Sequence, residues 1–215
     1  MKNDFTELVF ILDRSGSMSG LEDDTIGGYN GFLKKQCDEV GEAVITTVLF
    51  DDKYELLHDR IDIKGVAPIT NRDYFVRGTT ALLDAIGKTI LKIETAQAHT
   101  IEDKRPEKTL VVITTDGMEN ASREFTKDKI KEMVERMKAE HGWEFIFLGA
   151  NIDSIKTAGG IGIDATRTAN YHPDSVGTAM NFDVIARVAS DIRVKRCMDD
   201  DWKRDIDKDY GSRKK

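Results

Sequence analysis

The chain has 215 residues, of which 40% are hydrophobic and 33% are charged, and its formal net charge is −7. This composition is that of a soluble globular protein, and the length is sufficient for one domain with a full core. The acidic balance argues against broad nucleic-acid binding, which needs a basic surface, and no apolar run approaches the ~20 residues that span a bilayer.

The N-terminus and the cysteines indicate the cellular compartment. The first four residues contain one lysine and then an acid, and no small-residue cleavage site follows the short apolar run, so we do not expect a secretory signal. Cys37 and Cys197 are too few for a disulfide framework. We therefore expect reduced thiols in a cytoplasmic protein.

Hydrophobic patterning predicts strands that alternate with helices along the chain. The segment after Asp51-Asp52 follows a tight turn, so its charged pattern indicates an antiparallel edge strand. Strands are expected over residues 8–12, 43–50, 54–63, 109–115, 143–148 and 165–169. Helices are expected over residues 23–40, 80–93, 126–142, 152–158 and 184–192.

This alternation, with a single hairpin, is typical of a doubly wound α/β sheet, mostly parallel and covered by helices on both faces. We expect residues 1–195 to form one domain. Residues 196–215 alternate acids and bases with little apolar content, which predicts a charged C-terminal tail that is solvated or continues the last helix.

Oxygen-bearing side chains follow the first buried strand. Asp13 ends the apolar run, and Ser15 and Ser17 follow at alternate positions around Gly16. A carboxylate with two hydroxyls suits a hard divalent cation, although the same residues are common in simple capping turns. Asp116 ends a second buried strand, and parallel strands bring their carboxyl ends to one edge of a sheet.

The spacing Asp-x-Ser-x-Ser, a distant threonine before an apolar helix, and Thr-Asp-Gly after a strand resemble the metal-ion-dependent adhesion site of the von Willebrand factor A domain family. The resemblance implies the strand order 3-2-1-4-5-6. It also implies that one divalent ion, Mg²⁺ or else Mn²⁺ or Ca²⁺, is ringed by Asp13, Ser15, Ser17, Thr80 and Asp116. We choose Thr80 because the family usually has Gly-Gly-Thr here, which aligns Thr79 with the second glycine.

In that family the serines and the threonine contact the ion, while the carboxylates act largely through water. Three neutral hydroxyls leave the ion with much of its positive charge, so its open position favours an acidic side chain. The prediction is a non-enzymatic, metal-dependent module that binds an acidic residue of a partner protein, not nucleic acid or a membrane. Its specificity would come from the loops around Met18, Gly78, Gly117 and Met118.

Two other interpretations stay open. A strand that ends in aspartate above Mg²⁺ is also how haloacid-dehalogenase-like phosphatases begin, which would make Asp13 a nucleophile. Those enzymes have a second aspartate two residues later; this chain has Ser15 there, and serine does not transfer that proton near neutral pH. The third interpretation is a purely structural domain without a bound ion.

Overall fold

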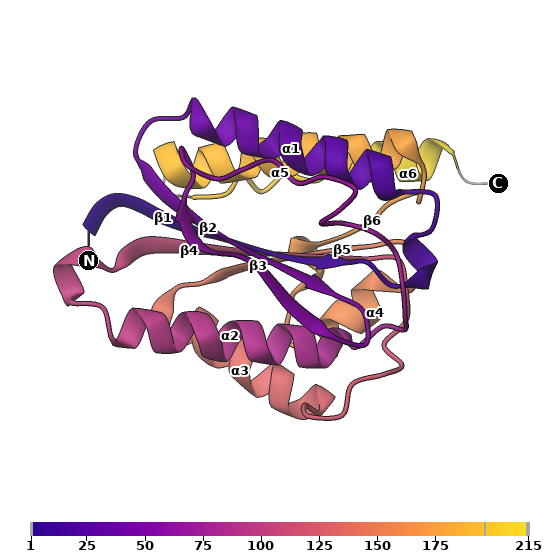
Figure 1. Ribbon diagram of the computed structural model, residues 1–215, viewed down its shortest axis with the longest axis horizontal. Coiled ribbons are helices and arrows are strands. Elements are labelled where there is room, and N and C mark those ends of the chain that lie inside the picture. The colour runs from indigo at the N-terminus through magenta and orange to yellow at the C-terminus, as the bar shows by residue number, and fades with distance from the viewer. Residues whose placement is uncertain (1, 196, 214–215) are drawn as a thin grey trace.

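A six-stranded sheet lies between two layers of helices (Figure 1). The structure, a computed structural model, describes residues 2–195 and 197–213. The strand order is β3-β2-β1-β4-β5-β6, and every neighbouring pair is parallel except β2 and β3. The predicted order and the single antiparallel hairpin are confirmed. The strands are β1 (Lys2–Asp13), β2 (Glu42–Phe50), β3 (Tyr54–Asp62), β4 (Pro106–Thr115), β5 (Glu144–Gly149) and β6 (Thr168–Asn170).

Helices cover both faces of this sheet. One layer holds α1, α5 and α6, and the other holds α2, α3 and α4 (Figure 1). None of the described helices is long and apolar enough to cross a membrane. The helices are α1 (Glu22–Cys37), α2 (Leu82–Ala98), α3 (Lys127–His141), α4 (Ser154–Gly159), α5 (Ser175–Lys195) and α6 (Arg204–Ser212).

The central strand β1 is continuously apolar from Leu8 to Leu12, because both of its faces are buried there. Leu8, Phe10 and Leu12 belong to the core beneath α1 and α5, whereas Val9 and Ile11 belong to the core above α2 and α3. Successive side chains of a strand point to opposite faces, so a strand covered on both sides reads as a continuous apolar run. The run ends at Asp13, where the sheet reaches its carboxyl edge.

Gly28 allows α1 to lie close to α5. A Cβ atom at this position would come within 2.2 Å of the Phe182 ring. The absence of a side chain at Gly28 therefore serves the packing of α1 against another helix, not against the sheet.

Several element boundaries differ from the predicted ones. α1 ends at Cys37, and Val40, expected on its apolar face, is exposed. A short 3-10 turn at Glu102–Lys104 precedes β4, which begins at Pro106, three residues before the predicted start at residue 109. A second turn, Ala165–Arg167, occupies most of the last predicted strand. Local hydrogen bonding decides these ends, which hydrophobic periodicity does not encode.

The C-terminal segment packs against the domain instead of being solvated. Trp202 and Ile206 are 6% and 2% exposed and belong to the core shared with α5. Trp202 Nε1 donates to the carbonyl oxygen of Thr166 at 2.8 Å, and Lys203 Nζ donates to that of Thr168 at 2.7 Å. The predicted solvated tail or helical continuation is therefore wrong over residues 197–213; residues 1, 196, 214 and 215 lie outside the described part.

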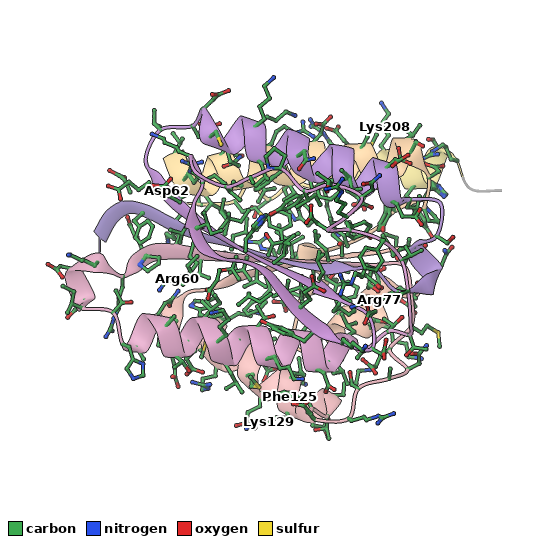
Figure 2. The ribbon with its side chains drawn as sticks, in the orientation of Figure 1. Arg60, Asp62, Arg77, Phe125, Lys129 and Lys208 are labelled. Atoms are coloured by element: carbon green, nitrogen blue, oxygen red, sulfur yellow. The ribbon has the colours of Figure 1, made fainter. Side chains whose placement is uncertain are left out.

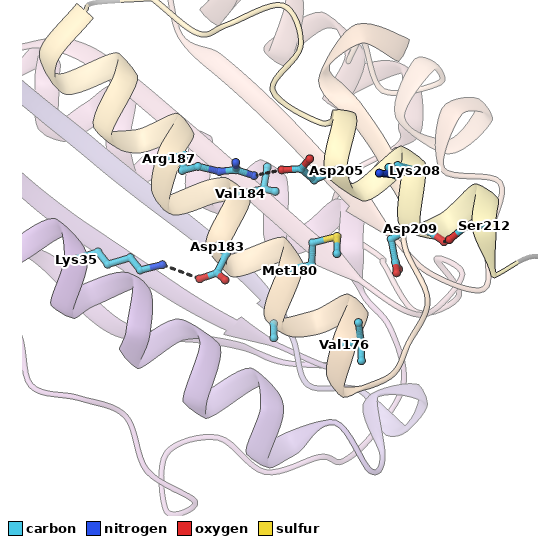
Figure 3. A pocket seen from close by; sticks show the side chains of 11 residues that line it. Lys35, Val176, Met180, Asp183, Val184, Arg187, Asp205, Lys208, Asp209 and Ser212 are labelled. Atoms are coloured by element: carbon cyan, nitrogen blue, oxygen red, sulfur yellow. Dashed lines mark hydrogen bonds and ion pairs between the residues drawn. The ribbon is translucent and has the colours of Figure 1, made fainter.

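An open groove of about 800 Å³ runs between α1, α5 and α6 (Figure 3). An ion pair joins Lys35 of α1 to Asp183 of α5 at 2.6 Å, and another joins Arg187 of α5 to Asp205 of α6 at 2.6 Å. These pairs tie α5 to the helix on each side. Because all four side chains are exposed, each pair contributes little to stability, and the buried apolar contacts of α6 do more.

We expect Trp202→Ala to lower the free energy of unfolding by about 3 kcal/mol, because it removes a buried indole and its hydrogen bond. Urea unfolding measures this loss. The control is Val176→Ala on α5, where the side chain is exposed and the expected change is within about 0.5 kcal/mol. A Trp202→Ala variant as stable as wild type would contradict the packing of this segment.

Candidate metal centre

Two buried carboxylates meet at the carboxyl edge of the sheet. Asp13 ends β1, Asp116 follows β4, and these strands are parallel neighbours. Asp13 is 0% exposed; its Oδ1 accepts the backbone N–H of Ser15 at 2.7 Å, and its Oδ2 accepts the Thr115 hydroxyl at 2.6 Å. Asp116 is 4% exposed, and its Oδ1 accepts from Asn151 Nδ2 at 2.7 Å. Both orientations are therefore fixed by hydrogen bonds.

Three hydroxyls cluster beside these carboxylates. Ser15 Oγ lies 3.0 Å from Ser17 Oγ and accepts a hydrogen bond from Thr80 Oγ1 at 3.0 Å. Gly117 closes the group, because a Cβ atom there would lie 2.8 Å from both the Ser17 and the Thr80 oxygens. Thr80 is buried and Thr79 is exposed, so Thr80 is the threonine that turns toward this cluster. Segments far apart in sequence thus bring five oxygen-bearing side chains to one place.

The turn before α2 is held to the loop after β4. The Thr80 N–H donates to Asn120 Oδ1 at 3.0 Å, and the Asn120 N–H donates back to the Thr80 carbonyl at 3.0 Å. Glu119 Oε2 accepts the N–H of Leu83 in the first turn of α2 at 2.9 Å. These bonds satisfy amides at the start of the helix and fix where the Thr80 side chain points.

Sequence analysis missed three polar residues that support this site: Thr115, Asn120 and Asn151. A signal existed for two of them. Thr115 is a hydroxyl at the end of an apolar strand, beside Asp116. Asn151 follows the next parallel strand, β5, so its side chain was available at the same sheet edge. Asn120 had no such signal, because its role depends on how the loop folds back onto Thr80.

The two carboxylates disfavour each other's charge. Burial raises the pKa of Asp13, although hydrogen bonds from Thr115 and Ser15 oppose the rise. Burial also raises the pKa of Asp116, the bond from Asn151 opposes it, and the charge of Asp13 raises it further. Among the residues that the structure describes, no Lys, Arg or His forms an ion pair with either one. A bound cation would relieve this unfavourable burial of negative charge.

The donor set fits a hard divalent cation. No three His, Cys, Asp or Glu side chains group as a metal site within the described ranges. Two carboxylates and three hydroxyls instead form an all-oxygen set, which suits Mg²⁺, Mn²⁺ or Ca²⁺. Two neighbouring ligands of an octahedral Mg²⁺ site lie about 3.0 Å apart. The Ser15–Ser17 and Ser15–Thr80 oxygen distances, both 3.0 Å, equal that spacing.

The loops predicted to meet a partner are exposed to different degrees. Met118 is 71% exposed, Gly78 is also exposed, and Gly117 is half-buried. Met18 is 3% exposed, and its side chain lines a small internal cavity together with Phe10 and Phe182. That the loop around Met18 supplies specificity stays a prediction: the Met18 side chain is covered, and Ser17 and Ser19 on either side of it are exposed.

Comparison with solved protein structures identifies the fold of this chain. No family model and no curated protein matches the sequence. Solved structures do match. The von Willebrand factor domain of the type V pili tip protein Mfa5 from Porphyromonas gingivalis aligns with a TM-score of 0.62 and 12% identity, over 86% of this chain and 94% of that one.

Two further solved structures contain a bound metal ion. Proximal thread matrix protein 1 from the mussel byssus, with a zinc-occupied MIDAS motif, aligns with a TM-score of 0.56 and 15% identity, over 88% of this chain and 47% of that one. Manganese-loaded TRAP protein of Plasmodium vivax aligns with a TM-score of 0.56 and 17% identity, over 85% and 74%. The chain thus spans about half the length of the mussel protein. These likenesses show that it has the von Willebrand factor A fold.

We expect Asp116→Asn to stabilise the metal-free protein at neutral pH. The folded-state pKa of Asp116 is raised above its ordinary value of 3.8, so the carboxyl stabilises the folded protein only below that value, and this contribution is lost as the pH rises through the folded-state pKa. The amide removes the charge and keeps the acceptor for Asn151. Urea unfolding in excess chelator should give the variant the higher midpoint at neutral pH and equal midpoints below pH 3.8. A lower midpoint at neutral pH would contradict this account.

Proposed function

We propose that this chain binds a divalent cation, Mg²⁺ or else Mn²⁺ or Ca²⁺, through Asp13, Ser15, Ser17, Thr80 and Asp116, and that the cation recruits an acidic residue of a partner protein. The observation that carries this proposal is the cluster of three hydroxyls at 3.0 Å spacing beside two buried carboxylates without a basic partner among the described residues. Such a group is unfavourable without a cation and favourable with one.

The arrangement supports an exposed and still electropositive ion. Both oxygens of Asp13 accept hydrogen bonds, one from Ser15 and one from Thr115. These donors already stabilise part of the carboxylate charge, so Asp13 would neutralise a bound cation less. The neutral hydroxyls add no charge. Ser17 and Gly78 are exposed, which leaves this side of the site accessible. A carboxylate from outside is the ligand that a hard, incompletely neutralised cation favours.

Binding accounts for the site better than hydrolysis does. As a nucleophile, Asp13 would have to be reached by a substrate much larger than an ion, yet its side chain is 0% exposed. Ser15 stands where a phosphatase of the alternative class has its second aspartate, and its hydroxyl belongs to the hydroxyl cluster. The solved von Willebrand factor A folds with zinc or manganese in their descriptions lend further support to a cation here.

We expect Thr80→Ala to abolish stabilisation by Mg²⁺ and Thr79→Ala to leave it intact. At a free Mg²⁺ concentration about 100 times Kd, wild type should gain about 2.7 kcal/mol of unfolding free energy. The two threonines are adjacent, but only Thr80 Oγ1 contacts Ser15. Urea unfolding with and without Mg²⁺ measures the gain. If Thr79→Ala lost the gain and Thr80→Ala kept it, the assignment of the threonine would be wrong.

We expect partner binding to need both the ion and its ligands. Immobilised wild-type protein should retain a partner from a native lysate of its source with Mg²⁺ and release it in excess chelator, and Thr80→Ala should retain nothing. Replacing the partner's contacting Asp or Glu by its amide should also abolish retention. A partner that binds equally well in chelator would overturn the cation-dependent mechanism.

A further inference from the structure

A fully buried ion pair lies beneath the loop that carries Asp13 and Ser15. Arg14 and Asp51 are both 0% exposed, and Arg14 Nε donates to Asp51 Oδ2 at 3.1 Å. Charged side chains are almost never fully buried unless they are paired, and removing one member leaves an uncompensated charge. Asp51 was expected only to form the turn between two strands. Its side chain has a second role that the sequence did not indicate.

Two more residues complete this cluster. Arg77 Nε donates to the same Asp51 oxygen at 2.6 Å, and Glu55 accepts from Arg14 Nη2 at 2.6 Å. Two guanidinium groups are therefore matched by two carboxylates. Burial raises the pKa of Asp51, but hydrogen bonds from Arg77 and Lys53 and the charge of Arg14 lower it below its ordinary value. The carboxylate is thus ionised at neutral pH.

Backbone bonds connect this cluster to both parts of the candidate metal centre. The Asp51 carbonyl accepts the N–H of Ala81, the residue after Thr80, at 2.8 Å. The N–H of Arg77 donates to the carbonyl of Arg14 at 2.9 Å. Asp51 therefore contacts the neighbour of Asp13 and Ser15 through its side chain, and the neighbour of Thr80 through its main chain.

We infer that Asp51 is a positioning residue of the cation site: it fixes the Ser15 loop relative to Thr80 and so sets the affinity for the cation. It acts through Arg14 and Ala81 and does not touch the ion. This inference rests on the proposed function. The Ser15 and Thr80 hydroxyls, 3.0 Å apart, belong to two different chain segments. Asp51 is hydrogen-bonded to both segments and so fixes the distance between them. Residues that orient metal ligands affect affinity almost as strongly as the ligands do.

The chain offers a matched control at the other end of the sheet. Glu7, on β1, is also 0% exposed and accepts from Arg60 Nε at 2.7 Å. Figure 2 shows Arg60 and Arg77, the partners of the two buried carboxylates, toward opposite ends of the molecule. Glu7→Gln and Asp51→Asn thus remove the same kind of buried charge, one far from the cation site and one beneath it.

The test is Mn²⁺ binding, followed by the electron paramagnetic resonance signal of free Mn²⁺, on the full chain. We expect Asp51→Asn to weaken Mn²⁺ binding about 10- to 100-fold and Glu7→Gln to leave it unchanged. Urea unfolding without metal should show Asp51→Asn destabilised, because the substitution leaves the buried Arg14 guanidinium without its charged partner. A purely structural role for Asp51 predicts the same destabilisation with no difference in Mn²⁺ affinity between the two folded variants.

A folded Asp51→Asn variant that binds Mn²⁺ as tightly as wild type overturns the inference. If wild type itself does not bind Mn²⁺, it is the proposed function that fails. If Asp51→Asn does not fold, Arg77→Gln replaces it, because the Arg77 side chain is 38% exposed and its loss is better tolerated. Arg77→Gln should weaken Mn²⁺ binding and Arg77→Lys should restore part of it; wild-type affinity in Arg77→Gln overturns the inference.

Discussion

The buried, like-charged pair formed by Asp13 and Asp116 is the constraint on which the carboxyl edge of this sheet depends. Neither carboxylate has a basic partner among the described residues; burial raises the pKa of both, and the charge of Asp13 raises that of Asp116 further. Hydrogen bonds from Thr115 and Asn151 reduce this rise in pKa without cancelling it. The two carboxylates thus lower the stability of the folded protein at this edge of the sheet, as is common where a site must attract a ligand of opposite charge.

Successive side chains of the loop after β1 point in alternate directions and contact different groups. Asp13, Ser15 and Ser17 turn to the hydroxyl and carboxylate cluster, while Arg14 between them turns away to Asp51. Met18 then anchors the end of the loop in the core. The Arg14 guanidinium is therefore paired with Asp51 and does not compete with a cation for Asp13.

Local pattern predicted the first five strands and failed where distant contacts decide. The continuous run Leu8–Leu12 predicted a strand buried on both faces, and strand polarity placed Asp13 and Asp116 at one edge. The full burial of Arg14 depends on partners 37 and 41 residues away, which no local pattern reveals. In the C-terminal segment the abundance of charge concealed Trp202 and Ile206, which are both buried although Trp202 lies in the turn before α6.

The side chains that attach the C-terminal segment to the rest of the domain also cover one edge of the sheet. β6 is the last strand in the order, so one side of it has no neighbouring strand. Lys203 donates to the carbonyls of Ala165 and Thr168, and Trp202 donates to that of Thr166. Of these acceptors Thr168 lies in β6, so an extended peptide from a second molecule would find its carbonyl occupied, and those of the turn before it as well. Self-association by strand addition is thereby blocked at β6, which leaves the charged, antiparallel β3 as the margin where further strands could add.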